Sequence, residues 1–129
     1  MSIKLFKDIR PIHSDERGDI IEILDAGQTD IKSTLLITCT PGAIRANHYH
    51  KKDSHYCYML AGSMEYYEQP IGGDESQREM VVVKKGDMVY TPPMVVHAMK
   101  FLEDSVFLTL ATTSRRGNYE DDTVRIKLI

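Results

Sequence analysis

Three of the chain's five histidines fall within ten residues, in the stretch NHYHKKDSHY (47–56). Imidazole binds transition metals and exchanges protons near neutral pH, so such a cluster indicates metal binding or acid–base chemistry. His48 and His50 are two residues apart, which on a β-strand directs both side chains to one face. Ile44 and Ala46 share that face, so we expect it to line an apolar barrel interior.

His55 follows this pair by five residues, and the intervening KKDS suits a turn. Adjacent strands lie about 5 Å apart, so a histidine that opens the second strand approaches the pair that ends the first. Imidazole nitrogens bind zinc at about 2.0–2.1 Å, which three converging rings can satisfy. His97, in TPPMVVHAM, is available as a fourth ligand, whereas His13 lies in a polar stretch and is expected to be solvated.

The elements that must position these histidines are short strands. β-Branched and aromatic residues come in brief runs closed by turn residues, and no amphipathic helix of three turns is evident. About nine strands follow, a pattern typical of an antiparallel sandwich or barrel, and a jelly roll fits the count and the length. The runs cover 19–26, 33–40, 43–50, 55–61, 64–69, 77–83, 94–101, 105–113 and 122–129, with a short MVY run at 88–90.

Composition narrows the class of protein. The 129 residues suit one domain over 1–129, and 42% hydrophobic residues can fill one core. The net charge of −3 without a basic stripe argues against nucleic-acid binding. No apolar run approaches the roughly 18 residues that span a bilayer, and the start resembles no secretory signal. Cys39 and Cys57 lie in apolar runs, so we expect buried thiols and a cytoplasmic protein.

The histidine cluster also fits a known pattern. Five residues separate Gly42 from His48, and six residues separate His55 from Gly62. In every spacing the stretch at about 42–62 resembles the first motif of the cupin superfamily. This resemblance implies a double-stranded β-helix, the jelly-roll barrel, with a metal site at its centre. The motif residues are Gly42, His48, His50, His55 and Gly62, with His55 where the family usually has Glu.

A second cupin motif follows at about 86–101. Gly86, Pro92 and His97 match it, while Met94 replaces a glycine and Phe101 replaces an asparagine. The resemblance implies one divalent transition metal ion, and imidazole ligands suit zinc, manganese, iron or nickel. Its implied ligands are His48, His50, His55 and His97.

A narrower resemblance concerns enzymes of nucleotide-linked sugars. DERGDIIEI (15–23), RANHYHKKDSH (45–55) and NYEDDTVRI (118–126) resemble segments of the dTDP-sugar 3,4-ketoisomerases, and a related pattern occurs in the cupin domain of capsular-polysaccharide reductases. In the ketoisomerases the histidines act as acid–base groups without metal, and Gln stands at the position of His55. The resemblance therefore implies catalytic roles for His48 and His50.

We therefore expect an isomerase or epimerase that moves a proton next to a carbonyl in a nucleotide-linked deoxysugar. Arg45 suits stabilisation of the enolate oxygen, and Arg17 with Arg45 suits the diphosphate. Tyr58 and Tyr90 are candidates for stacking on the substrate. A metal-dependent dioxygenase and a non-catalytic module that binds a small ligand are the alternatives. The TVRIKLI end strand is a candidate edge for homodimer formation.

Overall fold

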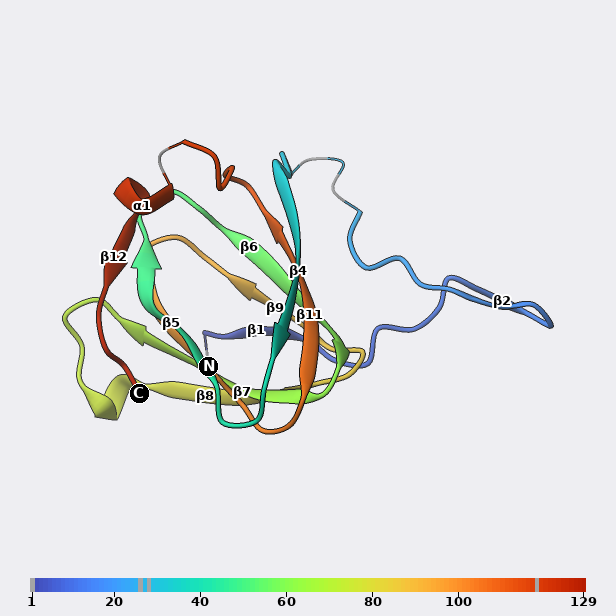
Figure 1. Ribbon diagram of the computed structural model, residues 1–129, viewed down its shortest axis with the longest axis horizontal. Helices are drawn as coiled ribbons and strands as arrows, with labels where there is room; N and C mark the ends of the chain where they lie inside the picture. Colours follow the sequence, from blue (N-terminus) through green and yellow to red (C-terminus); the bar gives the residue numbers. More distant parts are fainter. Residues whose placement is uncertain (1, 26, 28, 118) are drawn as a thin grey trace.

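The computed structural model describes residues 2–25, 27, 29–117 and 119–129. Two five-stranded antiparallel sheets enclose one barrel, with the strand orders β1-β9-β6-β11-β4 and β12-β5-β10-β7-β8. A separate hairpin, β2-β3, projects away from the barrel on a long connection (Figure 1). The expectation of an all-β, single-domain cupin barrel is confirmed.

The first sheet contains β1 (Lys4–Phe6), β9 (Met88–Thr91), β6 (His55–Ala61), β11 (Ser105–Ala111) and β4 (Ser33–Cys39). The second sheet contains β12 (Thr123–Arg125), β5 (Ile44–His50), β10 (Val95–Phe101), β7 (Ser63–Pro70) and β8 (Glu79–Lys84). Outside the two sheets lie β2 (His13–Asp15), β3 (Gly18–Ile20), the short 3-10 helix η1 (Glu75–Gln77) and the one-turn helix α1 (Tyr119–Asp122). In the described part of the chain, no helix is long and apolar enough to cross a membrane.

Two predicted strands are wrong in extent. The run at 19–26 is a strand only as far as Ile20, where β3 ends. This part of the chain lies outside the barrel, and β3 pairs with β2. Ala26 lies outside the described residues. The run at 122–129 begins in α1 and pairs with β5 only over Thr123–Arg125. Beyond β12 the chain end is tied to its own barrel, since the backbone N–H groups of Leu128 and Ile129 donate to Asn47 Oδ1.

The apolar core fills one end of the barrel and leaves the other end to the histidines. Phe101 and Phe107 stack with ring centroids 5.5 Å apart, and Met59, Met64 and Tyr66 surround them without exposed surface. Each of these residues alternates along its strand with an outward-facing neighbour, as strand geometry requires. Cys39 and Cys57 are buried free thiols, as expected.

Gly62 closes the first motif in a position that only glycine tolerates. Its φ is +84°, and a Cβ there would lie 2.5 Å from the backbone oxygen of Asp104 and closer still to Ser105 Oγ. Gly42 has a similar φ of +80° but open space around it. A side chain at position 62 therefore causes both backbone strain and overpacking, whereas a side chain at position 42 causes backbone strain alone.

We expect Gly62→Ala to lower the free energy of unfolding by about 2–5 kcal/mol, and Gly42→Ala by only about 1–2 kcal/mol. Urea denaturation of both variants beside the unmodified chain measures the difference. Equal losses in the two variants would show that the close approach of the Asp104–Ser105 backbone is unimportant.

Candidate active site in the barrel

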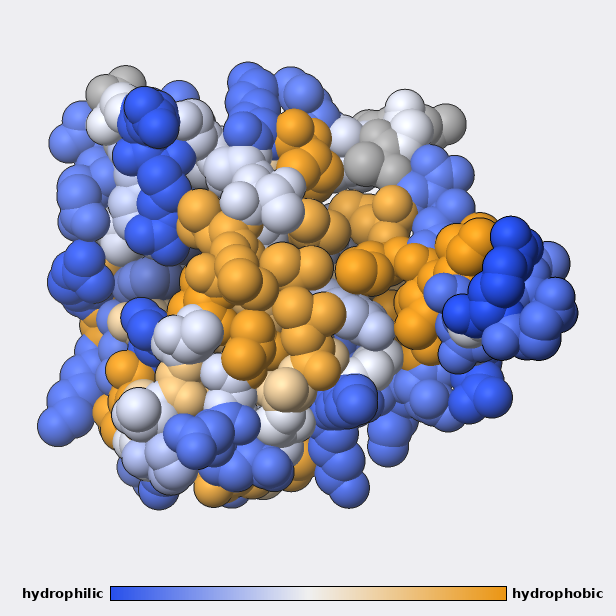
Figure 2. Space-filling view, turned by 45° about the vertical axis from the view of Figure 1, so that its right-hand side comes forward, coloured by the Kyte–Doolittle hydropathy of each residue, from blue (hydrophilic) through white to orange (hydrophobic). Residues whose placement is uncertain are grey.

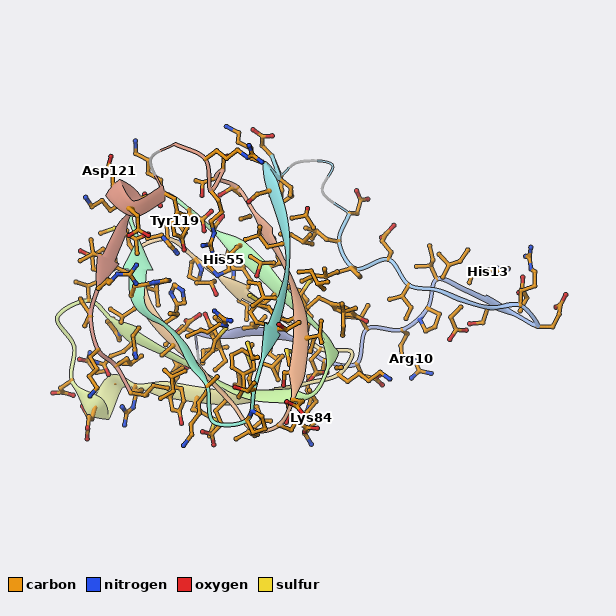
Figure 3. The ribbon with its side chains drawn as sticks, in the orientation of Figure 1. Arg10, His13, His55, Lys84, Tyr119 and Asp121 are labelled. Atoms are coloured by element: carbon orange, nitrogen blue, oxygen red, sulfur yellow. The ribbon has the colours of Figure 1, made fainter. Side chains whose placement is uncertain are left out.

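All four predicted ligands lie together inside the barrel. β5 supplies His48 and His50, β6 supplies His55 and β10 supplies His97, and all are buried. The ring centroid of His48 lies 4.5 Å from that of His50 and 4.7 Å from that of His97. The ring of His55 lies 5.8 Å from that of His50 and 5.5 Å from that of His97. His13, by contrast, lies far out on the projecting hairpin (Figure 3).

A β-bulge in β5 brings Arg45 to the same pocket. Strict alternation would place Arg45 on the opposite face from His48, but the pairing of β5 with β10 shifts between these residues. Ala46 and Asn47 have φ of +70° and +57°, so the chain takes an extra residue there. Arg45 consequently lines the pocket, while Ile44, expected to face inward, is exposed.

Three of the four rings form a hydrogen bond through the same atom, Nδ1. His97 Nδ1 donates to the backbone oxygen of Val95 (3.2 Å), and His55 Nδ1 lies 2.9 Å from an Asp53 carboxylate oxygen. His50 Nδ1 lies 3.2 Å from Thr123 Oγ1, which itself donates to a backbone oxygen and can therefore accept from the ring. In His50 and His97 Nε2 is left to act as ligand or proton acceptor, and in His55 it can do so only when the ring is neutral.

Burial and the proximity of the rings to one another give the four histidines different pKa values. Burial lowers the pKa of His48 to about 3, and the neighbouring rings of His50 and His55 add to the effect. The pKa values of His50 and His97 are also lowered, first by burial and then by the charge of His55. Burial acts on His55 in the same direction, but the hydrogen bond to Asp53 and the contact with Cys57 raise its pKa to about 9. At neutral pH the metal-free site therefore holds three neutral rings and one imidazolium.

The donor set fits a divalent transition metal ion. His48, His50 and His97 offer ligand atoms within 4.8 Å of one another, and His50 forms a second such group with Asp53 and His55. His48 Nδ1 and His97 Nε2 are buried without a hydrogen-bond partner among the described residues, which costs free energy unless something binds there. The hydrogen-bonded Nδ1 atoms match the outer-shell arrangement of metal-ligating histidines.

The histidines line a cavity of about 220 Å³ whose other walls come from both sheets and from the C-terminal segment. Leu35, Ile37 and Phe107 supply apolar surface, so the pocket combines a polar end with an apolar wall. Arg115 lies over the ring of Tyr119, 4.2 Å from its centroid, and Tyr119 in turn lies 5.4 Å from the ring of His50. The charged lining residues outside the histidine cluster are Arg45, Asp53, Arg115, Glu120 and Arg125.

Three predicted substrate-binding residues lie elsewhere. Arg17 is on the projecting hairpin with its side chain 81% exposed, and its guanidinium pairs with Asp15 at 2.6 Å. Tyr58 and Tyr90 alternate with the inward-facing residues of β6 and β9, so they lie on the outer face of the first sheet. These three residues therefore do not line the histidine pocket, and their predicted role in substrate binding stays a prediction.

The sequence reasoning missed the residues that hold the histidines in place. Asp53 precedes His55 by two residues in KKDSH, and a carboxylate so close to a candidate ligand was the available signal. Asp122 accepts the backbone N–H groups of Lys52 and Asp53 and lies 3.7 Å from His50 Nδ1. Its contribution, and that of Tyr119, depends on the return of the C-terminal segment to the barrel mouth.

Comparison with solved structures places the fold among enzymes of nucleotide sugars. A 3,4-ketoisomerase from Thermoanaerobacterium thermosaccharolyticum, a double mutant in complex with TDP, has 27% identity and a TM-score of 0.74, covering 95% of this chain and 86% of that one. A 3,4-ketoisomerase from Helicobacter canadensis has 20% identity and a TM-score of 0.77, covering 97% and 91%.

A capsular polysaccharide assembling protein from Staphylococcus aureus has 19% identity and a TM-score of 0.69, covering 77% of this chain but only 27% of that protein. The search of curated proteins gave no match. The model of the polysaccharide biosynthesis C-terminal domain matches residues 13–123, which include every histidine of the site. The chain belongs to the family of polysaccharide biosynthesis C-terminal domains.

Proposed function

We propose that this protein catalyses an isomerisation or epimerisation by proton transfer next to the carbonyl of a nucleotide-linked deoxysugar. One observation carries the proposal: four buried histidines lie together at the polar end of a pocket that three arginines also line. Similarity to a 3,4-ketoisomerase with TDP bound supports the substrate class.

The neutral rings supply the base of this reaction. His48 and His50 are kept unprotonated by burial. His50 is the stronger candidate to accept the proton from the carbon next to the carbonyl, because a pKa of about 3 makes His48 a weak base. The oxygen that gains negative charge requires a cationic donor. His55, which Asp53 keeps protonated, and Arg45, whose guanidinium donates to Cys39 Sγ and to the backbone oxygen of Thr38, are the candidates within the pocket.

Arginines at the pocket suit the nucleotide end of the substrate. Arg115 and Arg125 come from the C-terminal segment, and Arg45 comes from the opposite wall. Guanidinium groups bind diphosphate oxygens through paired N–H donors. Arg125 is partly neutralised by Glu120 at 3.2 Å, whereas Arg115 contacts the Tyr119 ring. We assign the main diphosphate contact to Arg115.

We further propose that the histidines bind one divalent transition metal ion. The buried, unpartnered nitrogens of His48 and His97 support this proposal. Such an ion would supply Lewis acidity at a substrate oxygen. A ring nitrogen that binds an ion cannot also accept a proton. The histidines would therefore be ligands in a metal-bound form and bases in a metal-free form, and the metal content of the protein distinguishes the two forms.

A panel of dTDP-4-keto-6-deoxyhexoses in deuterated buffer tests the reaction. We expect conversion to a product of the same skeleton with uptake of one solvent deuterium. Arg115→Ala should raise KM by about 10–100-fold with little change in kcat, because it removes a charge-assisted contact to the diphosphate. Assays with chelated protein and with added zinc, manganese, iron or nickel are run in parallel. No turnover of any sugar in any of these forms would overturn the proposed reaction.

A further inference from the structure

A buried polar bridge crosses the barrel beside the histidines, although its surroundings are largely apolar. Apolar side chains fill the core, and others gather on the outer surface next to the projecting hairpin (Figure 2). In the bridge, the Tyr66 hydroxyl donates to Glu68 Oε2 (2.6 Å) and lies 2.8 Å from Thr91 Oγ1. Tyr66 has no exposed surface, and Thr91 and Glu68 are 1% and 3% exposed. Burial of a carboxyl group costs free energy, and no step of the proposed reaction uses Glu68.

The strand register places the bridge next to two of the four histidines. Glu68 on β7 stands directly opposite His97 on β10. Thr91 on β9 stands directly opposite His55 on β6. Residues that are directly opposite in an antiparallel pair lie on the same face, with Cβ atoms about 4.5–5.5 Å apart. Each end of the bridge is therefore the lateral neighbour of one histidine.

The bridge also connects the two sheets of the barrel. β7 and β10 belong to the second sheet, whereas β6 and β9 belong to the first. His55 and His97 therefore reach their ring separation of 5.5 Å across the barrel interior, from strands in different sheets. Beside these rings, the Tyr66 hydroxyl joins a residue of β7 to a residue of β9 and so ties the sheets together.

The separation of His55 and His97 decides how the site can be used. One group of potential ligands contains His97 with His48 and His50. The other group contains His55 with His50 and Asp53. Ligand atoms within each group lie within 4.8 Å of one another, but neither group contains both His55 and His97. A small change in the gap between the sheets therefore determines whether these two rings can act on one ion or one substrate.

We propose that Tyr66, Glu68 and Thr91 are positioning residues that set the separation of His55 and His97. The Tyr66 hydroxyl fixes the gap between β7 and β9. Each of these strands is paired in register with the strand that carries the neighbouring histidine, so the gap is passed on to the two rings. The consequence for metal binding and proton transfer rests on the proposed function, whereas the ring separation itself does not.

Two substitutions that each remove one hydroxyl of the bridge test the proposal. Tyr66→Phe and Thr91→Val keep the size of the side chain. Tyr67→Phe is the matched control for the first, because the Tyr67 hydroxyl donates to Glu65 (2.9 Å) from the opposite face of the same strand. Thr91→Ser, which retains a hydroxyl, is the control for the second.

NMR of chelated protein with labelled histidines measures the nuclear Overhauser cross-peaks between the His55 and His97 rings. We expect these cross-peaks to weaken in both bridge variants and to be unchanged in both controls. Zinc titration in competition with a chelator should show an affinity about 10-fold lower in the bridge variants, the lower end of the effect of an outer-shell change. A role in stability alone would lower the free energy of unfolding of Tyr66→Phe without changing the cross-peaks.

Unchanged cross-peaks in both bridge variants would overturn the proposal, and so would equal weakening in Tyr66→Phe and Tyr67→Phe. If Tyr66→Phe fails to fold by circular dichroism, Thr91→Val and Thr91→Ser decide by the same measurement. Cross-peaks that respond as expected in a chain that binds no zinc and converts no sugar would support the positioning role and overturn the proposed function. Normal zinc binding and turnover with unchanged cross-peaks would overturn the positioning role alone.

Discussion

Replacing His50 with alanine is expected to prevent binding of the proposed metal ion and to abolish the proposed isomerisation. His50 is the member shared by both groups of potential ligands, the one with His48 and His97 and the one with Asp53 and His55. Its loss therefore breaks both groups, and we expect the metal affinity to fall by more than the roughly 10–100-fold typical of outer-shell changes. If the ring instead acts as the base of a metal-free site, the rate falls by about 10²–10⁴-fold.

Two measurements separate these outcomes. Metal content after growth with supplied zinc, manganese, iron or nickel reports binding, and solvent-deuterium uptake reports proton transfer. His13→Ala is the matched control, because His13 is exposed on the projecting hairpin and its ring contacts Asp15 rather than any histidine of the site. Unchanged metal content in His50→Ala would remove His50 from the metal site. An unmodified chain that takes up none of these ions would contradict the metal proposal itself.

Replacing Asp53 with asparagine is expected to release the proton from His55 at neutral pH. The Asp53 carboxylate opposes the effect of burial and holds the pKa of His55 at about 9, above the 6.5 of a free imidazole. An amide at position 53 can still accept one hydrogen bond, but it carries no charge. Burial then dominates, and the pKa of His55 in the variant should fall below 6.5.

This change alters the pH dependence of stability in the metal-free protein. A histidine whose pKa is higher in the folded chain contributes stability that is complete below pH 6.5 and is lost as the pH rises through 9. The unmodified chain should therefore lose on the order of 2–4 kcal/mol of unfolding free energy across this window. In Asp53→Asn the loss over the same window should be absent, because His55 is already neutral.

Two measurements on chelated protein check this expectation. Urea denaturation between pH 6 and 10 gives the unfolding free energy, and ¹⁵N titration of the imidazoles gives the pKa of His55. Asp121→Asn serves as the control, because it removes a charge at the barrel mouth from an exposed residue that does not line the pocket. A His55 titration that is unaffected by Asp53→Asn would show that the Asp53 carboxylate does not set its charge. With metal restored, the same variant should bind about 10–100-fold more weakly, as expected for a lost outer-shell partner.

The fold was largely predictable from local signals. Runs of β-branched and aromatic residues closed by turns report strands directly, because their side chains alternate between a core and a surface. Gly42 and Gly62, each with positive φ, stand where the motif spacing requires a turn. The projecting hairpin was the exception. The run from Asp19 onwards is rich in isoleucine, as a barrel strand is, but such a run indicates only that the segment needs an apolar contact and does not show which surface provides it.

The sequence by itself indicated that His48 and His50 share one face of a strand, and the resemblance to the two cupin motifs added His55 and His97. The expected pairing of the two strands that carry His50 and His55 is wrong, because β5 and β6 lie in different sheets and the rings meet across the barrel interior. Only the tertiary structure decided what surrounds them. Asp122 and Thr123 reach His50 because the C-terminal segment returns to the barrel and pairs with β5. The tertiary structure also decided that Arg17 lies on the projecting hairpin, which no local pattern reports. The physical reason is that strand alternation is encoded within a few residues, whereas the contacts of Asp122 and Thr123 join residues 69 to 73 positions apart.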